Sequence, residues 1–105
     1  MERTIHPDVL QNKLDNSFLL DVRRANDLAT SNEKLPGALW RDPEKIEEWA
    51  DTLPHDQEIV LYCVRGGSVS NSVVDKLQAR GFRARYIEGG IEGWKTAGGA
   101  TESKP

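Results

Sequence analysis

The most constraining feature of the sequence is a run of four apolar residues at 59–62, Ile-Val-Leu-Tyr, near the middle of the chain. A strand with one face in water alternates apolar and polar side chains, because successive side chains point to opposite faces. This run is apolar at every position. It therefore predicts a central strand that is covered on both faces, as in the parallel sheets of α/β domains.

The segments on either side alternate between two patterns. Short apolar runs predict further strands at residues 3–5, 18–22, 37–40 and 83–87. Apolar residues at helical spacing predict helices at 7–14, 43–53 and 69–80. Strands that alternate with helices favour parallel β-α-β units with right-handed connections. We therefore expect an α/β domain.

Length and charge limit the functions that this chain can have. The 105 residues are enough for one domain, which we place at 1–97, followed by a small, polar and flexible tail at 98–105. The net charge of −3 provides no overall basic field for nucleic acid or for an anionic membrane. No apolar run is long enough to span a bilayer. We expect a cytoplasmic protein that is a monomer, with no nucleic-acid or membrane partner.

The single cysteine, Cys63, follows directly after the predicted central strand. In open α/β sheets, ligands bind beyond the carboxyl ends of the strands. Gly66 and Gly67 allow the backbone to curl around the sulfur with positive φ, and the helix that follows directs its N-terminus toward the same point. Such surroundings stabilise a thiolate, which is the nucleophilic form of cysteine.

Polar residues beside Cys63 are the other candidates for this site. Arg65 can hold an oxyanion, and Ser68 can cap the helix or donate a hydrogen bond to a bound anion. The main alternative is that Cys63 is simply a small buried core residue, as lone cysteines often are. One cysteine with only His6 and His55 does not make a zinc site, so we expect no metal.

Four motifs, in order along residues 5–97, resemble the rhodanese-like sulfurtransferase family, and in particular its single-domain members. They are Leu20-Asp21-Val22-Arg23, Leu35-Pro36-Gly37-Ala38, the loop Tyr62-Cys63-Val64-Arg65-Gly66-Gly67-Ser68, and Glu88-Gly89-Gly90-Ile91-Glu92-Gly93-Trp94. The resemblance implies a parallel sheet of about five strands with helices on both faces. It also implies that Cys63 carries sulfur as a persulfide.

The same resemblance implies substrates and further site residues. The donor would be thiosulfate or a low-molecular-weight persulfide, and the acceptor would be cyanide in vitro and a thiol or a protein in the cell. No cofactor is implied. Residues 64–68 would bind the substrate: Val64, Arg65, Gly66, Gly67 and Ser68. Asp21 and Arg23 would brace the loop, and Trp40 would either line the mouth of the pocket or belong to the core.

The chain departs from the family pattern at two places. Lys34 stands where many members have histidine, and Ser68 stands where many have a basic residue. Two other readings stay open. A non-catalytic binding or sulfur-relay module would keep the fold for docking. A cysteine phosphatase or arsenate reductase is less favoured, because the position six residues after Cys63 is Val69 and not the phosphate-binding arginine.

Overall fold

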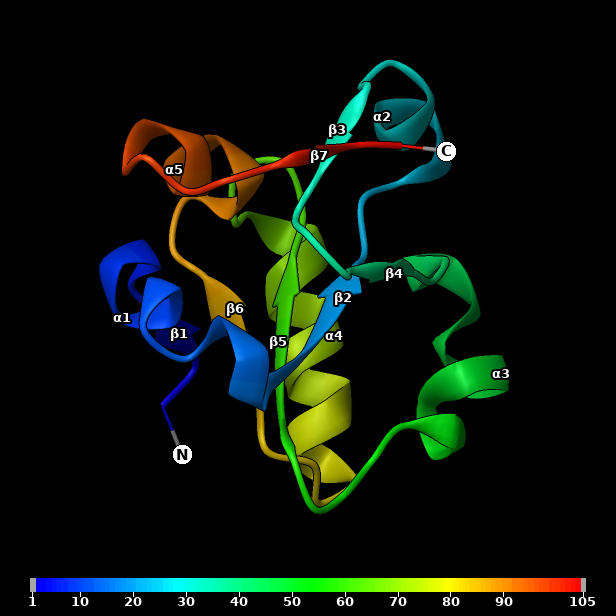
Figure 1. The fold of residues 1–105 in the computed structure, drawn as a ribbon. Coiled ribbons are helices and arrows are strands. Elements are labelled where there is room, and N and C mark those ends of the chain that lie inside the picture. Colours follow the sequence, from blue (N-terminus) through cyan, green and yellow to red (C-terminus); the bar gives the residue numbers. More distant parts are fainter. Residues whose placement is uncertain (1, 105) are drawn as a thin grey trace.

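The computed structural model describes residues 2–104, and its centre is a parallel sheet of five strands in the order β1-β6-β5-β2-β4 (Figure 1). The strands are β1 (Thr4–Ile5), β2 (Ser17–Asp21), β4 (Leu39–Trp40), β5 (Glu58–Tyr62) and β6 (Ala84–Ile87). Every pair of neighbours in this sheet is parallel. All five lie within or next to the segments expected from the sequence, so the predicted α/β fold is confirmed.

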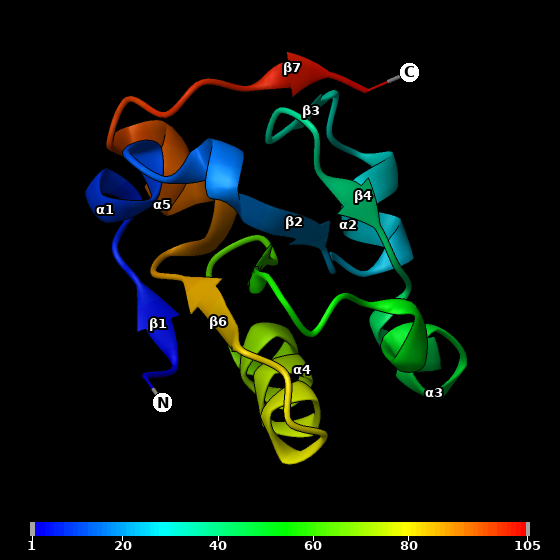
Figure 2. The same cartoon turned by 60° about the horizontal axis from the view of Figure 1, so that its bottom comes forward.

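Helices cover both faces of the sheet, as predicted. They are α1 (Pro7–Gln11), α2 (Ala25–Ala29), α3 (Ile46–Trp49), α4 (Ser68–Ala79) and α5 (Gly90–Thr96), with 3₁₀ turns at Leu14–Asn16, Pro43–Lys45 and Ala50–Thr52. Figure 2 shows α1 and α5 on one side of the sheet and α3 and α4 on the other. Within residues 2–104, no helix combines the length and the apolar character that crossing a bilayer requires.

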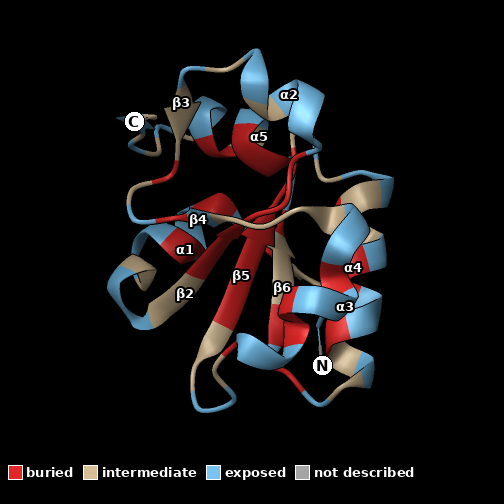
Figure 3. Ribbon diagram, turned by 90° about the vertical axis from the view of Figure 1, so that its right-hand side faces the viewer, coloured by how far each residue is buried: buried red, intermediate tan, exposed pale blue. Residues whose placement is uncertain are grey.

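The central strand β5 divides the core into two halves. Ile59 and Leu61 pack with residues of α3 and α4, whereas Val60 and Tyr62 pack with residues of α1 and α5. Four of its five residues are buried, and only Glu58 at its start is partly exposed (Figure 3). The unbroken apolar run thus reflects a strand that contributes side chains to two cores at once.

The helices differ from the sequence-based expectation at several places: the helix expected at 7–14 ends at Gln11, and α5 was not among the expected helices. Residues 43–53 do not form one helix: the backbone departs from helical angles at Lys45 and Trp49, and the Trp49 indole N–H donates to the Asp42 carbonyl at 2.8 Å. Apolar spacing alone cannot separate a helix from successive short turns that bury the same side chains. Helix α2 was not expected, because none of its five residues is buried and no apolar periodicity marks it.

The C-terminal segment, expected to be a flexible tail, follows the surface of the domain. Its short strand β7 (Glu102–Ser103) pairs antiparallel with β3 (Glu33–Lys34). The Trp94 indole N–H donates to the Ala100 carbonyl at 2.8 Å. The paired residues of β3 and β7 lie about 70 residues apart in the sequence. Local composition therefore could not predict this contact.

Candidate active site

The register of the sheet brings two strand ends together at one edge. Asp21, at the end of β2, lies opposite Tyr62, at the end of β5. The Val22 N–H donates to the Tyr62 carbonyl at 2.9 Å, so the ladder continues one residue beyond the strand. The chain segments that follow, starting at Arg23 and at Cys63, therefore leave the sheet side by side.

The loop that begins with Cys63 is fastened to the N-terminus of α5. The Cys63 carbonyl accepts a hydrogen bond from the Ile91 N–H at 3.0 Å, and the Val64 carbonyl accepts one from the Glu92 N–H at 3.1 Å. A Cβ atom on Gly90 would lie 2.5 Å from both carbonyl oxygens, so only glycine allows this approach. These contacts turn the two carbonyls toward α5.

The backbone N–H groups of the same loop remain available to donate hydrogen bonds to a ligand. Within the part of the chain that the structure describes, no hydrogen bond from the backbone N–H groups of residues 64–67 is found. Helix α4 starts immediately afterwards at Ser68, so the first-turn amides and the positive end of its dipole adjoin the loop. Carbonyls that are engaged and amides that are free make this loop a suitable place for an anion.

Cys63 opens onto a hollow of about 370 Å³, which we call the cysteine hollow. Its lining residues are Arg24, Asp27, Cys63, Val64, Arg65, Gly67, Ser68 and Val69. The cysteine itself is only 6 % exposed, whereas Arg24 and Arg65 are exposed. Two arginines against one aspartate make the mouth of this hollow electropositive.

The two loop glycines have different reasons to be glycine. Gly66 has φ +72°, and a Cβ there would lie 3.1 Å from the Gly89 nitrogen. Gly67, for which we also expected positive φ, has φ −89° and ψ −144°, so that expectation was wrong. Gly67 stands at the cap position before α4, where no side chain supplies a cap. Ser68 is the first residue of α4 and lines the cysteine hollow instead.

Asp21 and Arg23 lie beneath the loop in a buried network and do not line the cysteine hollow. Arg23 is 1 % exposed and binds Asp21 through Nη2–Oδ2 at 2.7 Å and Nε–Oδ1 at 3.0 Å. The Tyr62 hydroxyl donates to Asp21 Oδ2 at 3.1 Å and accepts from the Leu35 N–H at 3.2 Å. The network thus holds the residue that directly precedes Cys63.

Burial and charge shift the pKa values of two residues in this network, Arg23 and Tyr62. Burial disfavours the charged guanidinium of Arg23, but the hydrogen bonds and the negative charge of Asp21 outweigh it and raise the Arg23 pKa. Burial, reinforced by the Asp21 charge, raises the pKa of the Tyr62 phenol. Arg23 and Tyr62 therefore both keep their protons at neutral pH, and the hydroxyl stays available as a donor.

Trp40 contacts this network from the edge of the sheet. Its indole N–H donates to the Arg23 carbonyl at 2.9 Å. The side chain lies in a separate hollow with Asp21, Leu28 and Lys34, not in the hollow that contains Cys63. Of the two places expected for Trp40, the structure does not put it at the mouth of the cysteine hollow; its side chain is partly buried at the edge of the sheet.

Three residues that line the cysteine hollow were missed by the reasoning from sequence: Arg24, Asp27 and Val69. Arg24 stands at the N-cap position of α2 and Asp27 lies within this helix, so both come within four residues of the strand-end sequence Asp-Val-Arg. No local pattern in the sequence marks Arg24 and Asp27, because their place beside Cys63 follows from the pairing of β2 with β5. Residues 2–104 contain no cluster of three or more His, Cys, Asp or Glu side chains placed to hold a metal ion.

Comparison with known proteins gives consistent matches. Residues 6–97 match the family model of the rhodanese-like domain. A thiosulfate sulfurtransferase GlpE of Actinobacillus succinogenes is 34% identical over 85 residues, which cover 80% of this chain and 74% of that protein. A thiosulfate sulfurtransferase GlpE of Coxiella burnetii is 31% identical over 78 residues, which cover 73% of this chain and 70% of that protein.

Solved structures agree with the sequence matches. A rhodanese-like domain protein of Staphylococcus aureus has a TM-score of 0.81 and 27% identity, and the match covers 99% of this chain and 100% of that one. A rhodanese-related protein of Thermoplasma volcanium has a TM-score of 0.85, and the match covers 96% of this chain and 98% of that one. Because the two sequences are only 23% identical, this likeness supports the fold alone. The chain therefore belongs to the rhodanese-like family, with sulfurtransferases among its relatives.

Proposed function

We propose that the protein is a sulfurtransferase that carries a sulfane sulfur on Cys63. The observation that supports this most is the loop at the end of β5. There the only thiol of the chain is followed by the amides of residues 64–67, which have no hydrogen-bond partner within residues 2–104, and then by the start of α4. A persulfide is an anion, and such a ring of donors stabilises it as an oxyanion hole stabilises its intermediate. The names of the curated relatives support the same reading.

The first half-reaction loads the cysteine. The Cys63 thiolate attacks the outer sulfur of thiosulfate, a new S–S bond forms, and the old S–S bond breaks with its electron pair leaving on sulfite. With a low-molecular-weight persulfide as donor, a thiolate leaves instead. Arg24 and Arg65 at the mouth of the hollow attract the anionic donor. No cofactor or metal takes part in either version.

The second half-reaction removes the outer sulfur from Cys63. A thiophilic acceptor attacks the outer sulfur, and the bond to the Cys63 sulfur breaks and returns the thiolate. Because the chain has only one cysteine, an internal disulfide cannot release the sulfur, and the acceptor comes from outside. Cyanide serves in vitro, and a thiol or a protein serves in the cell. A non-catalytic binding or sulfur-relay module remains the second candidate, and it predicts no turnover.

Steady-state kinetics tests the two half-reactions. With thiosulfate and cyanide both varied, double-reciprocal plots give parallel lines if the persulfide forms before cyanide reacts. Lines that intersect would contradict a covalent persulfide intermediate. Absence of any turnover with both thiosulfate and glutathione persulfide would favour the non-catalytic module.

Substitution of the arginine at the mouth tests the role of its charge. Arg65→Ala lowers kcat/KM for thiosulfate about fivefold at low salt, as expected for one exposed charge that attracts an anion, and the difference shrinks as salt is added. The matched control is Arg83→Ala, because Arg83 is also exposed and does not line the cysteine hollow. Equal effects of the two substitutions would contradict a local role for Arg65.

A further inference from the structure

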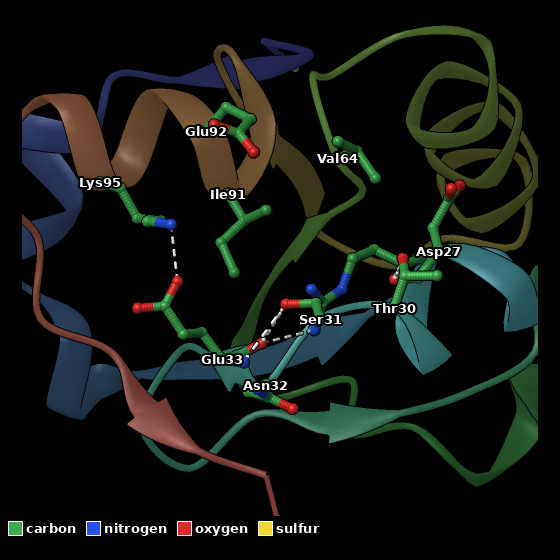
Figure 4. A pocket seen from close by; sticks show the side chains of 10 residues that line it. Asp27, Thr30, Ser31, Asn32, Glu33, Val64, Ile91, Glu92 and Lys95 are labelled. Atoms are coloured by element: carbon green, nitrogen blue, oxygen red, sulfur yellow. Dashed lines mark hydrogen bonds and ion pairs between the residues drawn. The ribbon is translucent and has the colours of Figure 1, made fainter.

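A second hollow adjoins the cysteine hollow and has a different character. Its volume is about 580 Å³, and we call it the side hollow (Figure 4). Its lining residues are Arg23, Asp27, Thr30, Ser31, Asn32, Glu33, Val64, Ile91, Glu92 and Lys95. Asp27 and Val64 line both hollows, so the two share a wall beside the reactive cysteine.

Most charges of the side hollow are already paired. Arg23 is bound to Asp21, and the Lys95 ammonium lies 2.6 Å from a Glu33 carboxylate oxygen. This contact with Lys95 is the main reason that the pKa of Glu33 is lowered, and the Lys95 pKa is raised chiefly by Glu33 and also by the charge of Glu92. The ion pair therefore persists across the neutral pH range and fixes one side of the hollow.

Of the three carboxylates that line the side hollow, those of Asp27 and Glu92 form no ion pair with another residue of the described range 2–104. Figure 4 shows Asp27 on the α2 side and Glu92 on α5, with Val64 of the cysteine loop between them. The backbone N–H of Glu92 donates to the Val64 carbonyl at 3.1 Å, so the main chain of Glu92 is fixed beside the loop. The cysteine hollow thus has an excess of cations, and the side hollow an excess of unpaired anions.

We propose that the side hollow binds the acceptor of the second half-reaction, and that this acceptor is a small thiol that carries an ammonium group. The proposal rests on the proposed function and adds the substrate class. The ammonium lies against Glu92, and the thiol end points past Val64 toward the outer sulfur on Cys63; Asp27, which lines both hollows, adds negative charge on the opposite side. Thr30, Ser31 and Asn32 supply polar contacts to the remainder of the molecule.

The transfer step is balanced without any further reagent. The acceptor loses its thiol proton to solvent and attacks as a thiolate. A bond forms between its sulfur and the outer sulfur, and the bond from the outer sulfur to Cys63 breaks. The electron pair of that bond returns to the Cys63 sulfur, so a thiolate and a persulfide enter the step and a persulfide and a thiolate leave it. The volume of the side hollow lies within the usual range for small-molecule sites.

The test uses three acceptors of similar size and different charge: cysteamine, 2-mercaptoethanol and 3-mercaptopropionate. The protein is first loaded with sulfur from glutathione persulfide, and the load is checked by intact mass. The rate of discharge is then measured for the wild type and for Glu92→Gln. Each acceptor is compared with itself between proteins, so the different acidities of the three thiols cancel.

The expected result is a change in selectivity. Glu92→Gln slows discharge by cysteamine about threefold relative to 2-mercaptoethanol, as expected for the loss of one exposed charge contact. The charge reversal Glu92→Lys slows cysteamine further and speeds 3-mercaptopropionate. The matched control is Glu48→Gln, because Glu48 is exposed on α3 and lines neither hollow; it leaves all three rates unchanged.

Two results would overturn the inference while the proposed function stands. One is an equal effect of Glu92→Gln on all three thiols, and the other is no effect on cysteamine in either Glu92 variant. If the wild type takes up no sulfur at the loading step, the proposed function fails, and the acceptor site fails with it. The mass measurement before discharge separates these cases.

Discussion

At the scale of the residue, the interest of Cys63 comes from its backbone surroundings. A thiol that is 6 % exposed in a small α/β domain is usually a core residue. Here the carbonyls of Cys63 and Val64 are taken up by α5, and the next four amides have no partner among the described residues. A core cysteine has no need of such a loop, whereas an anionic sulfur does.

Tyr62 is the residue that connects the buried charges to this loop. Its hydroxyl joins Asp21 to the Leu35 N–H, and removing it leaves a buried amide without a partner. We expect Tyr62→Phe to lower the free energy of unfolding by about 1–2 kcal/mol. Urea denaturation measures this directly.

The control for that substitution is Tyr86→Phe. Tyr86 is partly buried, and its hydroxyl makes no hydrogen bond among residues 2–104. Its loss should cost less than about 0.5 kcal/mol. If both substitutions cost the same, the buried network does not hold the end of β5 as described.

At the scale of the element, the site depends on one turn, Glu88-Gly89-Gly90, that holds the cysteine loop against α5. We expect Gly90→Ala to displace the loop, because its Cβ would overlap the Cys63 and Val64 carbonyls. Stability should fall by more than about 2 kcal/mol, and sulfur loading of Cys63 should fall with it. Denaturation and intact mass measure the two effects.

Gly81→Ala is the matched control for Gly90→Ala. Gly81 also has positive φ, at +87°, but a Cβ there would meet nothing within 4 Å. This substitution should cost only the backbone strain of about 1–2 kcal/mol and should leave sulfur loading intact. A Gly81→Ala variant that also fails to load sulfur would show that the effect is general and not a property of the turn.

The elements also show what the sequence could and could not predict. The run at 59–62 predicted a strand covered on both faces, and β5 fills two cores as expected. The loop at 63–68 could be proposed as the site from the sequence alone because its residues are consecutive. The lining residues Arg24 and Asp27 could not be assigned to the site from the sequence, because their position beside Cys63 depends on the order of the strands in the sheet. The pairing of β3 with β7 joins distant exposed segments, and no local pattern marks it.

At the scale of the whole molecule, acid sensitivity should come in part from one ion-pair group that joins three segments. Glu58 at the start of β5 lies 2.7 Å from Arg85 of β6 and 3.2 Å from Lys13. Burial works to raise the Glu58 pKa, but the contacts with Arg85 and Lys13 outweigh it and lower that pKa. Its ionisation therefore stabilises the fold above the ordinary pKa of a glutamate.

This stabilisation is lost as the pH falls through the lowered pKa of folded Glu58. The difference in free energy of unfolding between the wild type and Glu58→Gln should be largest near neutral pH and should shrink below about pH 4.5. Denaturation at a series of pH values measures it. Glu48→Gln should follow the wild-type profile, and a Glu58→Gln difference that does not change with pH would contradict the assignment.

The molecule as a whole presents two adjoining hollows of unlike charge at the carboxyl edge of one sheet, with Cys63 in one of them. In this account sulfur arrives at the basic hollow and leaves through the acidic one. Every step depends on Cys63 taking up a sulfur atom, so that uptake is the central claim.

Intact mass spectrometry tests it most directly. The wild type and Cys63→Ser are each incubated with thiosulfate, or in parallel with glutathione persulfide, and then with cyanide. We predict that the wild type gains the mass of one sulfur atom, that cyanide removes it, and that Cys63→Ser gains nothing. No gain with either donor, or the same gain in Cys63→Ser, would contradict the account.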